Sequence, residues 1–81
     1  MNEIVKKEYY VEFGITGGDI PFVMQSKWFQ KPQHALLWIK QNLPYIDDDK
    51  IGVYIMVANY INEDDFDIRQ FCRVINYELI F

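Results

Sequence analysis

Residues that carry nucleophilic or metal chemistry are scarce in this 81-residue sequence. It contains one cysteine, Cys72, one histidine, His34, one serine, Ser26, and one threonine, Thr16. A catalytic nucleophile needs a base to activate it and usually a third group to orient that base. A structural zinc site needs several Cys and His ligands close together. The sequence therefore predicts a protein that is not an enzyme and holds no cofactor or metal ion, with Cys72 in the core and His34 at the start of a helix.

The sequence also lacks the features of secreted and membrane proteins. A lone cysteine forms no internal disulfide, whereas small secreted domains are usually cross-linked. No apolar run approaches the roughly 20 residues that cross a bilayer. The charged residues 1–8 are not followed by the apolar stretch of a signal peptide. We therefore expect a cytoplasmic protein that does not act at a membrane.

Positive charge is in short supply. Eight Lys and Arg stand against twelve Asp and Glu, a net charge of −4, and eight of the acids lie in residues 41–81. Because phosphate contacts dominate nucleic-acid affinity, an acidic chain is a poor nucleic-acid binder. A weaker alternative is a surface on which cations alternate with stacking rings. Its residues would be Lys27, Trp28, Phe29 and Lys31.

Apolar and aromatic residues, in contrast, are plentiful. The chain is 51% hydrophobic and 17% aromatic, which is too apolar for a disordered protein. Its length is enough for one hydrophobic core and not for two. Residues 1–81 are therefore predicted to form a single domain.

The periodicity of the first half predicts a hairpin followed by a helix. Residues 8–15 alternate between apolar and polar, residues 16–19 supply glycines for a turn, and a second alternating run follows at about 22–29. Pro32 suits the first turn of a helix and Pro44 its end. The apolar stripe between them consists of Ala35, Leu36, Ile39 and Leu43, with Trp38 at its margin.

The second half predicts further strands. Residues 51–61 are rich in β-branched and aromatic side chains and are apolar on both faces, which is typical of a central strand. The segment after residue 67 fits both a helical stripe and a strand alternation, and its shortage of strong helix formers favours the strand. The predicted fold is α+β: a small antiparallel sheet in the order β-β-α-β-β, with one helix packed on one face.

The aromatic side chains cover more area than one helix can bury. Those in excess are Tyr10, Tyr54, Tyr60, Trp28 and Phe29. Either loops or a partner must cover the second face of the sheet, and we favour the partner. The apolar contact residues that we predict are Tyr54, Tyr60 and, in the middle of the helix's polar face, Leu37, although a single exposed leucine commonly has no function.

Seven carboxylates are concentrated in two short segments. They are Asp47, Asp48, Asp49, Glu63, Asp64, Asp65 and Asp67. The first segment resembles the opening of an EF-hand loop, but Ile51 occupies an oxygen-ligand position and Ala58 the closing bidentate position, so no calcium site is expected. A concentrated negative potential speeds association with a basic partner. The competing interpretation is that the acids only keep an aromatic-rich protein soluble.

These features predict an acidic protein-binding module. Its partner is expected to be a larger basic protein, such as a nuclease or another nucleic-acid-handling machine, which the module inhibits or modulates. In size, acidity and aromatic content the chain resembles small accessory proteins of phages and mobile elements, for example anti-CRISPR or anti-restriction proteins, and this resemblance implies inhibition of a host protein. The alternative is a self-associating structural subunit, paired through the aromatic sheet face or an edge strand.

Overall fold

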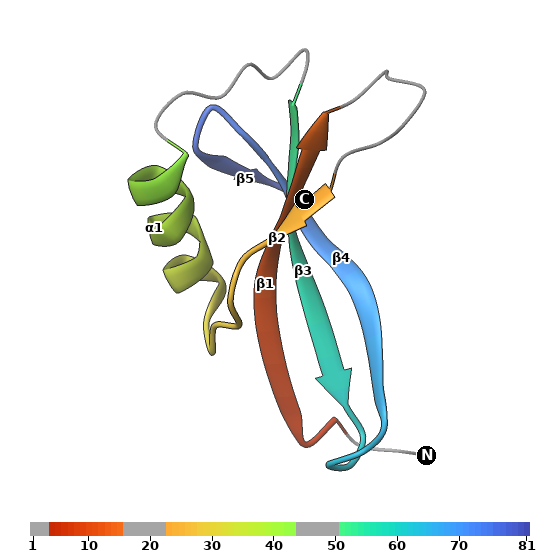
Figure 1. The fold of residues 1–81 in the computed structure, drawn as a ribbon. Coiled ribbons are helices and arrows are strands. Elements are labelled where there is room, and N and C mark those ends of the chain that lie inside the picture. Colours follow the sequence, from red (N-terminus) through yellow and green to blue (C-terminus); the bar gives the residue numbers. More distant parts are fainter. Residues whose placement is uncertain (1–3, 16–22, 44–50) are drawn as a thin grey trace.

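The computed structural model describes residues 4–15, 23–43 and 51–81 and contains five strands and one helix (Figure 1). In chain order they are β1 (Lys6–Ile15), β2 (Val23–Gln25), α1 (Pro32–Asn42), β3 (Ile51–Tyr60), β4 (Phe66–Ile75) and β5 (Glu78–Ile80). The strands form one antiparallel sheet in the spatial order β2-β1-β3-β4-β5. The predicted α+β class is confirmed, and β3 is the central strand as expected.

The predicted element order is wrong at its end, because the last segment forms two strands rather than one. The segment is extended, as the shortage of helix formers indicated, but a two-residue turn at Asn76 and Tyr77 folds it back so that Ile75 pairs with Glu78. Both turn residues have positive φ, 51° and 62°, as the primed turns of two-residue hairpins require. Asn adopts this conformation readily and Tyr does not, so the turn could not be predicted from these two residues.

The predicted second strand is much shorter than its alternation suggested. Its ladder ends after Gln25, and the chain rejoins β1 only at the isolated bridge between Phe29 and Tyr9. Between these points Ser26 keeps the segment hydrogen-bonded to β1. The Val11 N–H donates to Ser26 Oγ at 2.7 Å, and the Ser26 N–H donates to the Val11 carbonyl at 2.9 Å. The predicted turn at residues 16–19 and the predicted helix stop at Pro44 lie outside the described residues.

The core lies between α1 and one face of the sheet. Ala35 and Ile39 are fully buried, and Leu36, Trp38 and Leu43 pack against the same cluster, so the predicted helical stripe is confirmed. The buried side chains of the sheet that face α1 are Tyr9, Val11, Val53, Ile55, Val57, Cys72 and Val74. Cys72 is in the core and His34 is exposed in the first helical turn, both as predicted.

The helix is too short to cover the sheet. Eleven helical residues span about 16 Å, whereas each ten-residue strand spans about 33 Å. As a result α1 lies beside one half of β1 and β3, and the other half, with the β3–β4 turn at its tip, extends past the helix (Figure 1). The molecule is accordingly elongated, with extents of 40 × 28 × 21 Å.

Candidate functional site

The sheet face opposite α1, called the open face below, is defined by strand alternation and register. Alternate side chains of a strand point to opposite faces, and Tyr10 pairs with Met56, Glu12 with Tyr54. Since Val11 and Ile55 face the helix, the intervening residues of each strand face away from it. The open face comprises Lys6, Glu8, Tyr10, Glu12, Tyr54, Met56, Ala58, Tyr60, Phe66, Ile68, Gln70, Arg73, Ile75 and Ile80.

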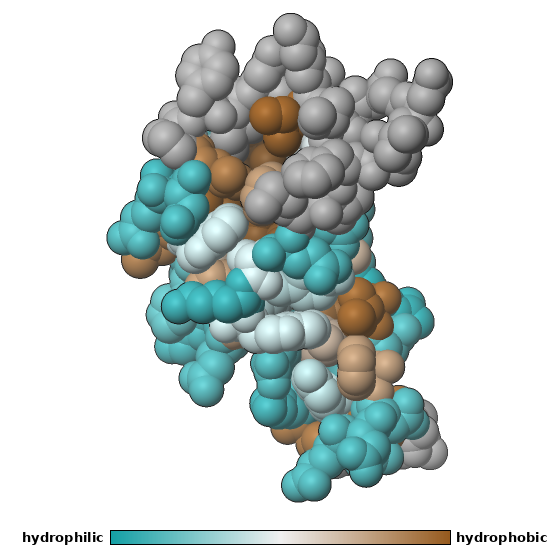
Figure 2. All heavy atoms as spheres, in the orientation of Figure 1, coloured by the Kyte–Doolittle hydropathy of each residue, from teal (hydrophilic) through white to brown (hydrophobic). Residues whose placement is uncertain are grey.

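The open face carries exposed apolar side chains. Phe66, Ile68 and Ile80 expose 45%, 43% and 43% of their surface, and Tyr54, Met56 and Tyr60 are half-buried. Hydrophobic and near-neutral side chains are visible between hydrophilic ones along β3 and β4 in Figure 2. Neighbouring apolar side chains on the surface of a small protein commonly mark an interaction site. This face has the composition of a protein contact.

One end of the open face is closed by the protein itself. Trp28 lies edge-on against Tyr10, with ring centroids 4.9 Å apart, and leaves Tyr10 only 6% exposed. Burial, together with the charge of Glu12 and a 3.3 Å hydrogen bond from the Tyr10 hydroxyl to that carboxylate, raises the pKa of Tyr10. Tyr10, which we expected to need a partner, is therefore already covered, and Trp28 presents its own exposed surface instead.

A cation lies beside the centre of the same face. The Arg73 guanidinium is 5.9 Å from the centre of the Tyr54 ring, close enough for a cation–π interaction. Its Nε is buried without a hydrogen-bond partner among the described residues. The ring of Tyr54 is thereby held in place from β4.

The acidic β3–β4 turn forms the tip of the open face. The Ile61 N–H donates to the Asp65 carbonyl at 2.9 Å, and the Asp64 N–H donates to Asn62 Oδ1 at 3.0 Å. These bonds occupy the backbone, and the carboxylates of Glu63, Asp64 and Asp65 are exposed. They make no salt bridge with another described residue, so their charge is available to a partner.

Two cations limit the charge at this tip. Arg69 pairs with Asp67 at 2.5 Å, so this acid, which sequence analysis grouped with the turn, is locally neutralised. Lys6 pairs with Glu8 at 2.6 Å and lies 5.2 Å from the centre of the Tyr60 ring. The hydrogen bond and charge of Glu8 are the main reasons why the pKa of Lys6 is raised.

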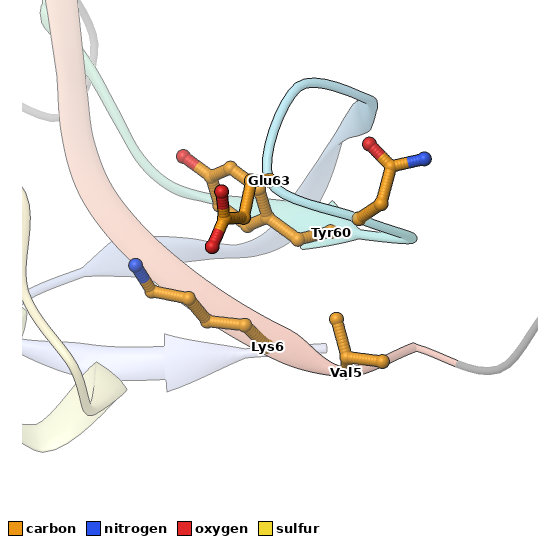
Figure 3. A pocket seen from close by; sticks show the side chains of 5 residues that line it. Val5, Lys6, Tyr60 and Glu63 are labelled. Carbon is orange, nitrogen blue, oxygen red and sulfur yellow. The ribbon is translucent and has the colours of Figure 1, made fainter.

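A shallow hollow lies between the turn and the start of β1. Figure 3 shows the side chains of Lys6, Tyr60 and Glu63 directed to the same side of it. It is about 280 Å³ in volume, is widely open, and is lined by Val5, Lys6, Tyr60, Asn62 and Glu63. Ligand pockets are larger and bury most of their ligand. This hollow suits one side chain of a protein partner better than a small molecule.

The structure brings together only some of the predicted contact residues. Tyr60 adjoins the acidic turn, and Tyr54 lies further along the same face. Leu37 is 52% exposed as predicted, but it lies on α1, on the other side of the sheet. Asp47, Asp48 and Asp49 lie outside the described residues.

Sequence reasoning missed three residues of the open face, Phe66, Ile68 and Ile80. The alternation of Phe66 and Ile68 would have placed them beside Tyr60 had the last strand been started at residue 66 rather than later. Ile80 depended on the turn before β5 and gave no such signal.

The residues of the nucleic-acid alternative do not share one surface. Trp28 packs on Tyr10 of the open face, whereas Phe29 packs against the core on the helix side, with Lys27 5.7 Å from its ring centre. Lys31 is exposed at the start of α1. The two rings therefore form no continuous stacking platform.

No three His, Cys, Asp or Glu side chains in residues 4–15, 23–43 and 51–81 are grouped so that they could hold a metal ion. The same residues include no helix with the length and hydrophobicity needed to span a membrane.

Comparison with known proteins adds no relative. No protein-family model, curated protein or solved structure matches this chain.

Proposed function

We propose that this protein is a protein-binding module that uses the open face to dock onto a basic protein partner. The observation that carries the proposal is that the half of the sheet beyond α1 has no covering layer among the described residues, yet displays Phe66 and Ile68 close to Tyr60. Interface centres are rich in aromatic side chains and poor in charge, with a polar rim around them. The Tyr60 and Phe66 rings, whose centroids are 5.0 Å apart, would form such a centre.

The acidic turn supports a basic partner. Glu63, Asp64 and Asp65 lie directly beside the aromatic pair, where a rim would be. Carboxylates at a rim steer a basic partner and raise its association rate more than they add affinity. We therefore assign the apolar residues to affinity and the turn to partner choice.

A basic surface large enough to receive this face is a common property of proteins that bind nucleic acid. Occupying such a surface would exclude the phosphates that normally bind there. For this reason we propose that the module inhibits or modulates a nuclease or another nucleic-acid-handling protein. The shallow, open hollow beside Tyr60 is in keeping with action by occupancy rather than by chemistry.

A capture and titration experiment tests the proposal. The tagged protein is used to retain proteins from host lysate at low and high salt, and each retained protein is then purified and titrated by calorimetry. We expect Phe66→Ala to weaken binding about 10-fold or more, because aromatic residues at an interface centre carry much of the affinity. The matched control is Leu37→Ala, an apolar side chain of similar exposure on the other side of the sheet.

The acidic turn is tested separately. The triple variant Glu63→Gln, Asp64→Asn, Asp65→Asn is expected to slow association and to flatten its dependence on salt, because exposed charges are screened. Lys40→Gln, which removes an exposed charge from α1 on the other side of the sheet, is the control. Binding that is unchanged in both Phe66→Ala and the triple variant would refute the proposed function.

A further inference from the structure

The outer edge of β4 is unpaired over most of its length. β5 pairs only with Arg73, Val74 and Ile75, and no strand of the described chain lies beside residues 66–71 on that side. An edge strand presents backbone N–H and C=O groups that can pair with another strand. Natural proteins usually cover such an edge or protect it with bulges and charges, and here a bulge near residue 71 and the exposed charges of Asp67 and Arg69 are present.

The side chains along this edge separate by face. Phe66, Ile68 and Gln70 belong to the open face, whereas Asp67 and Arg69 point to the opposite face. All five are exposed. The edge therefore combines a free backbone ladder, apolar side chains on one face and one charge of each sign on the other.

This arrangement is complementary to itself in one register. When two copies of β4 lie antiparallel with Ile68 opposite the partner's Ile68, Asp67 lies opposite the partner's Arg69, and Arg69 opposite the partner's Asp67. Each charge then has an opposite charge beside it along its own strand and another across the junction. Directly opposed unlike charges stabilise a strand pair and like charges destabilise it.

Neighbouring registers lack this match. In a symmetric antiparallel pair the residue on the axis faces its own copy, and paired residues share a face. Centring the pair on Arg69 would oppose two guanidinium groups, and centring it on Asp67 would oppose two carboxylates. Centring it on Gln70 would leave Arg69 opposite Phe71 and the bulge within the ladder.

We infer that this chain forms a symmetric dimer in which the β4 edges of two copies pair antiparallel about Ile68. The paired residues are 66–70 of each copy, and the two five-stranded sheets become one continuous sheet with the open faces on the same side. The inference goes beyond the proposed function and does not depend on it, because the dimer is held by backbone groups and charges along the β4 edge, whereas the proposed partner contacts side chains on the open face. A dimer would display two open faces to a partner.

Cross-linking tests the register. Residues directly opposite each other in an antiparallel pair have Cα atoms about 4.5–5.5 Å apart, within the range of a disulfide. Ile68→Cys is therefore expected to give a disulfide-linked dimer on mild oxidation. In Gln70→Cys the two thiols would lie about 14 Å apart along the strands, so this variant is the matched control and should remain unlinked.

Charge exchange provides an independent test by sedimentation velocity from micromolar to millimolar protein. Asp67→Arg alone gives an edge with two cations and Arg69→Asp alone an edge with two carboxylates, so each is expected to be monomeric. Mixed in equal amounts they should form a heterodimer. Lys31→Asp, the same charge change as Arg69→Asp but at an exposed position of the helix start, should leave the dimer intact, and circular dichroism checks that each variant folds.

The outcomes are decisive for this inference. A dimer that is lost in both single charge variants and regained in their mixture, with a cross-link only in Ile68→Cys, supports it. A wild-type chain that remains monomeric at every concentration overturns it, as does a dimer unaffected by the charge variants. Neither result bears on whether Phe66→Ala weakens binding to a basic protein.

Discussion

Two buried side chains show how the residues of this protein depend on their surroundings. Cys72 is only 2% exposed, and burial raises the pKa of its thiol. Tyr10 is held under Trp28 with its hydroxyl beside a carboxylate. In both cases the fold favours the neutral form of an acid.

Cys72 is expected to be unreactive in the folded protein. A thiol reagent attacks the thiolate, which burial disfavours and shields. Titration with a chromogenic disulfide reagent at neutral pH should give slow modification in buffer and one equivalent of rapid modification in denaturant. Rapid modification of the native protein would contradict the core position.

Tyr10 should make the protein less stable in alkali. A raised pKa in the folded state means that its contribution to the free energy of unfolding is fully present below the unfolded-state pKa of about 10 and is lost as the pH rises through the folded-state pKa. Urea unfolding between pH 8 and 11 should show this decline, and a shallower one in Tyr10→Phe. Equal slopes for the two proteins would show that Tyr10 is not the cause.

At the scale of elements, the sequence predicted the long helix and strands. The helix from Pro32 was predicted from its periodic apolar residues and the strand from Ile51 from its run of β-branched and aromatic residues, and both were found. β2 was predicted within residues 22–29, but its short length was not, and β5 was not predicted, because three residues contain no period. β2 ends where the side-chain oxygen of Ser26, rather than a backbone carbonyl, accepts the hydrogen bond from the Val11 N–H. β5 forms because Tyr77 adopts a positive φ in the turn that precedes it.

The helix should depend on its buried stripe and not on its polar face. Ile39→Ala removes a fully buried side chain from the core and is expected to lower the free energy of unfolding by about 2–5 kcal/mol. Leu37→Ala, two residues earlier and exposed, should change it by about 0.5 kcal/mol or less. Urea denaturation of both variants measures the difference. Equal losses in the free energy of unfolding would contradict the orientation of α1 in which Ile39 faces the core and Leu37 the solvent.

Tyr77 joins the last hairpin to the end of the helix. Its hydroxyl donates to the Leu43 carbonyl at 2.6 Å, directly after α1. Tyr77→Phe should therefore cost about 1 kcal/mol in thermal or urea unfolding. Tyr54→Phe, for which no hydroxyl hydrogen bond is found among the described residues, is the control and should cost less.

At the scale of the whole molecule, the sequence predicted that one helix leaves aromatic side chains of the sheet uncovered, but not which ones. Tyr10 proved to be covered by Trp28, and Leu37 lies away from the other candidates, while the partner itself stays a prediction. The pairing of β3 with β4 decides which side chains share the open face, and such long-range registers are set by tertiary packing rather than by local pattern. The partner contact predicted for the three acids at residues 47–49 stays a prediction.

The place of β1 in the sheet also governs how the chain acquires its structure during synthesis. β1 pairs with β3 along its whole length, from Lys6 opposite Tyr60 to Ile15 opposite Ile51. After Ile15 has been synthesised, 45 further residues must be added before β3 is complete. At the usual 5–20 residues per second, this takes about 2–9 s. The helix-facing side chains of β1, including Val11 and Phe13, have no neighbouring strand β3 during that time.

The β3–β4 hairpin, in contrast, can form as soon as β4 has been synthesised. We therefore expect the nascent chain to associate with chaperones until β3 has emerged, and to fold promptly afterwards.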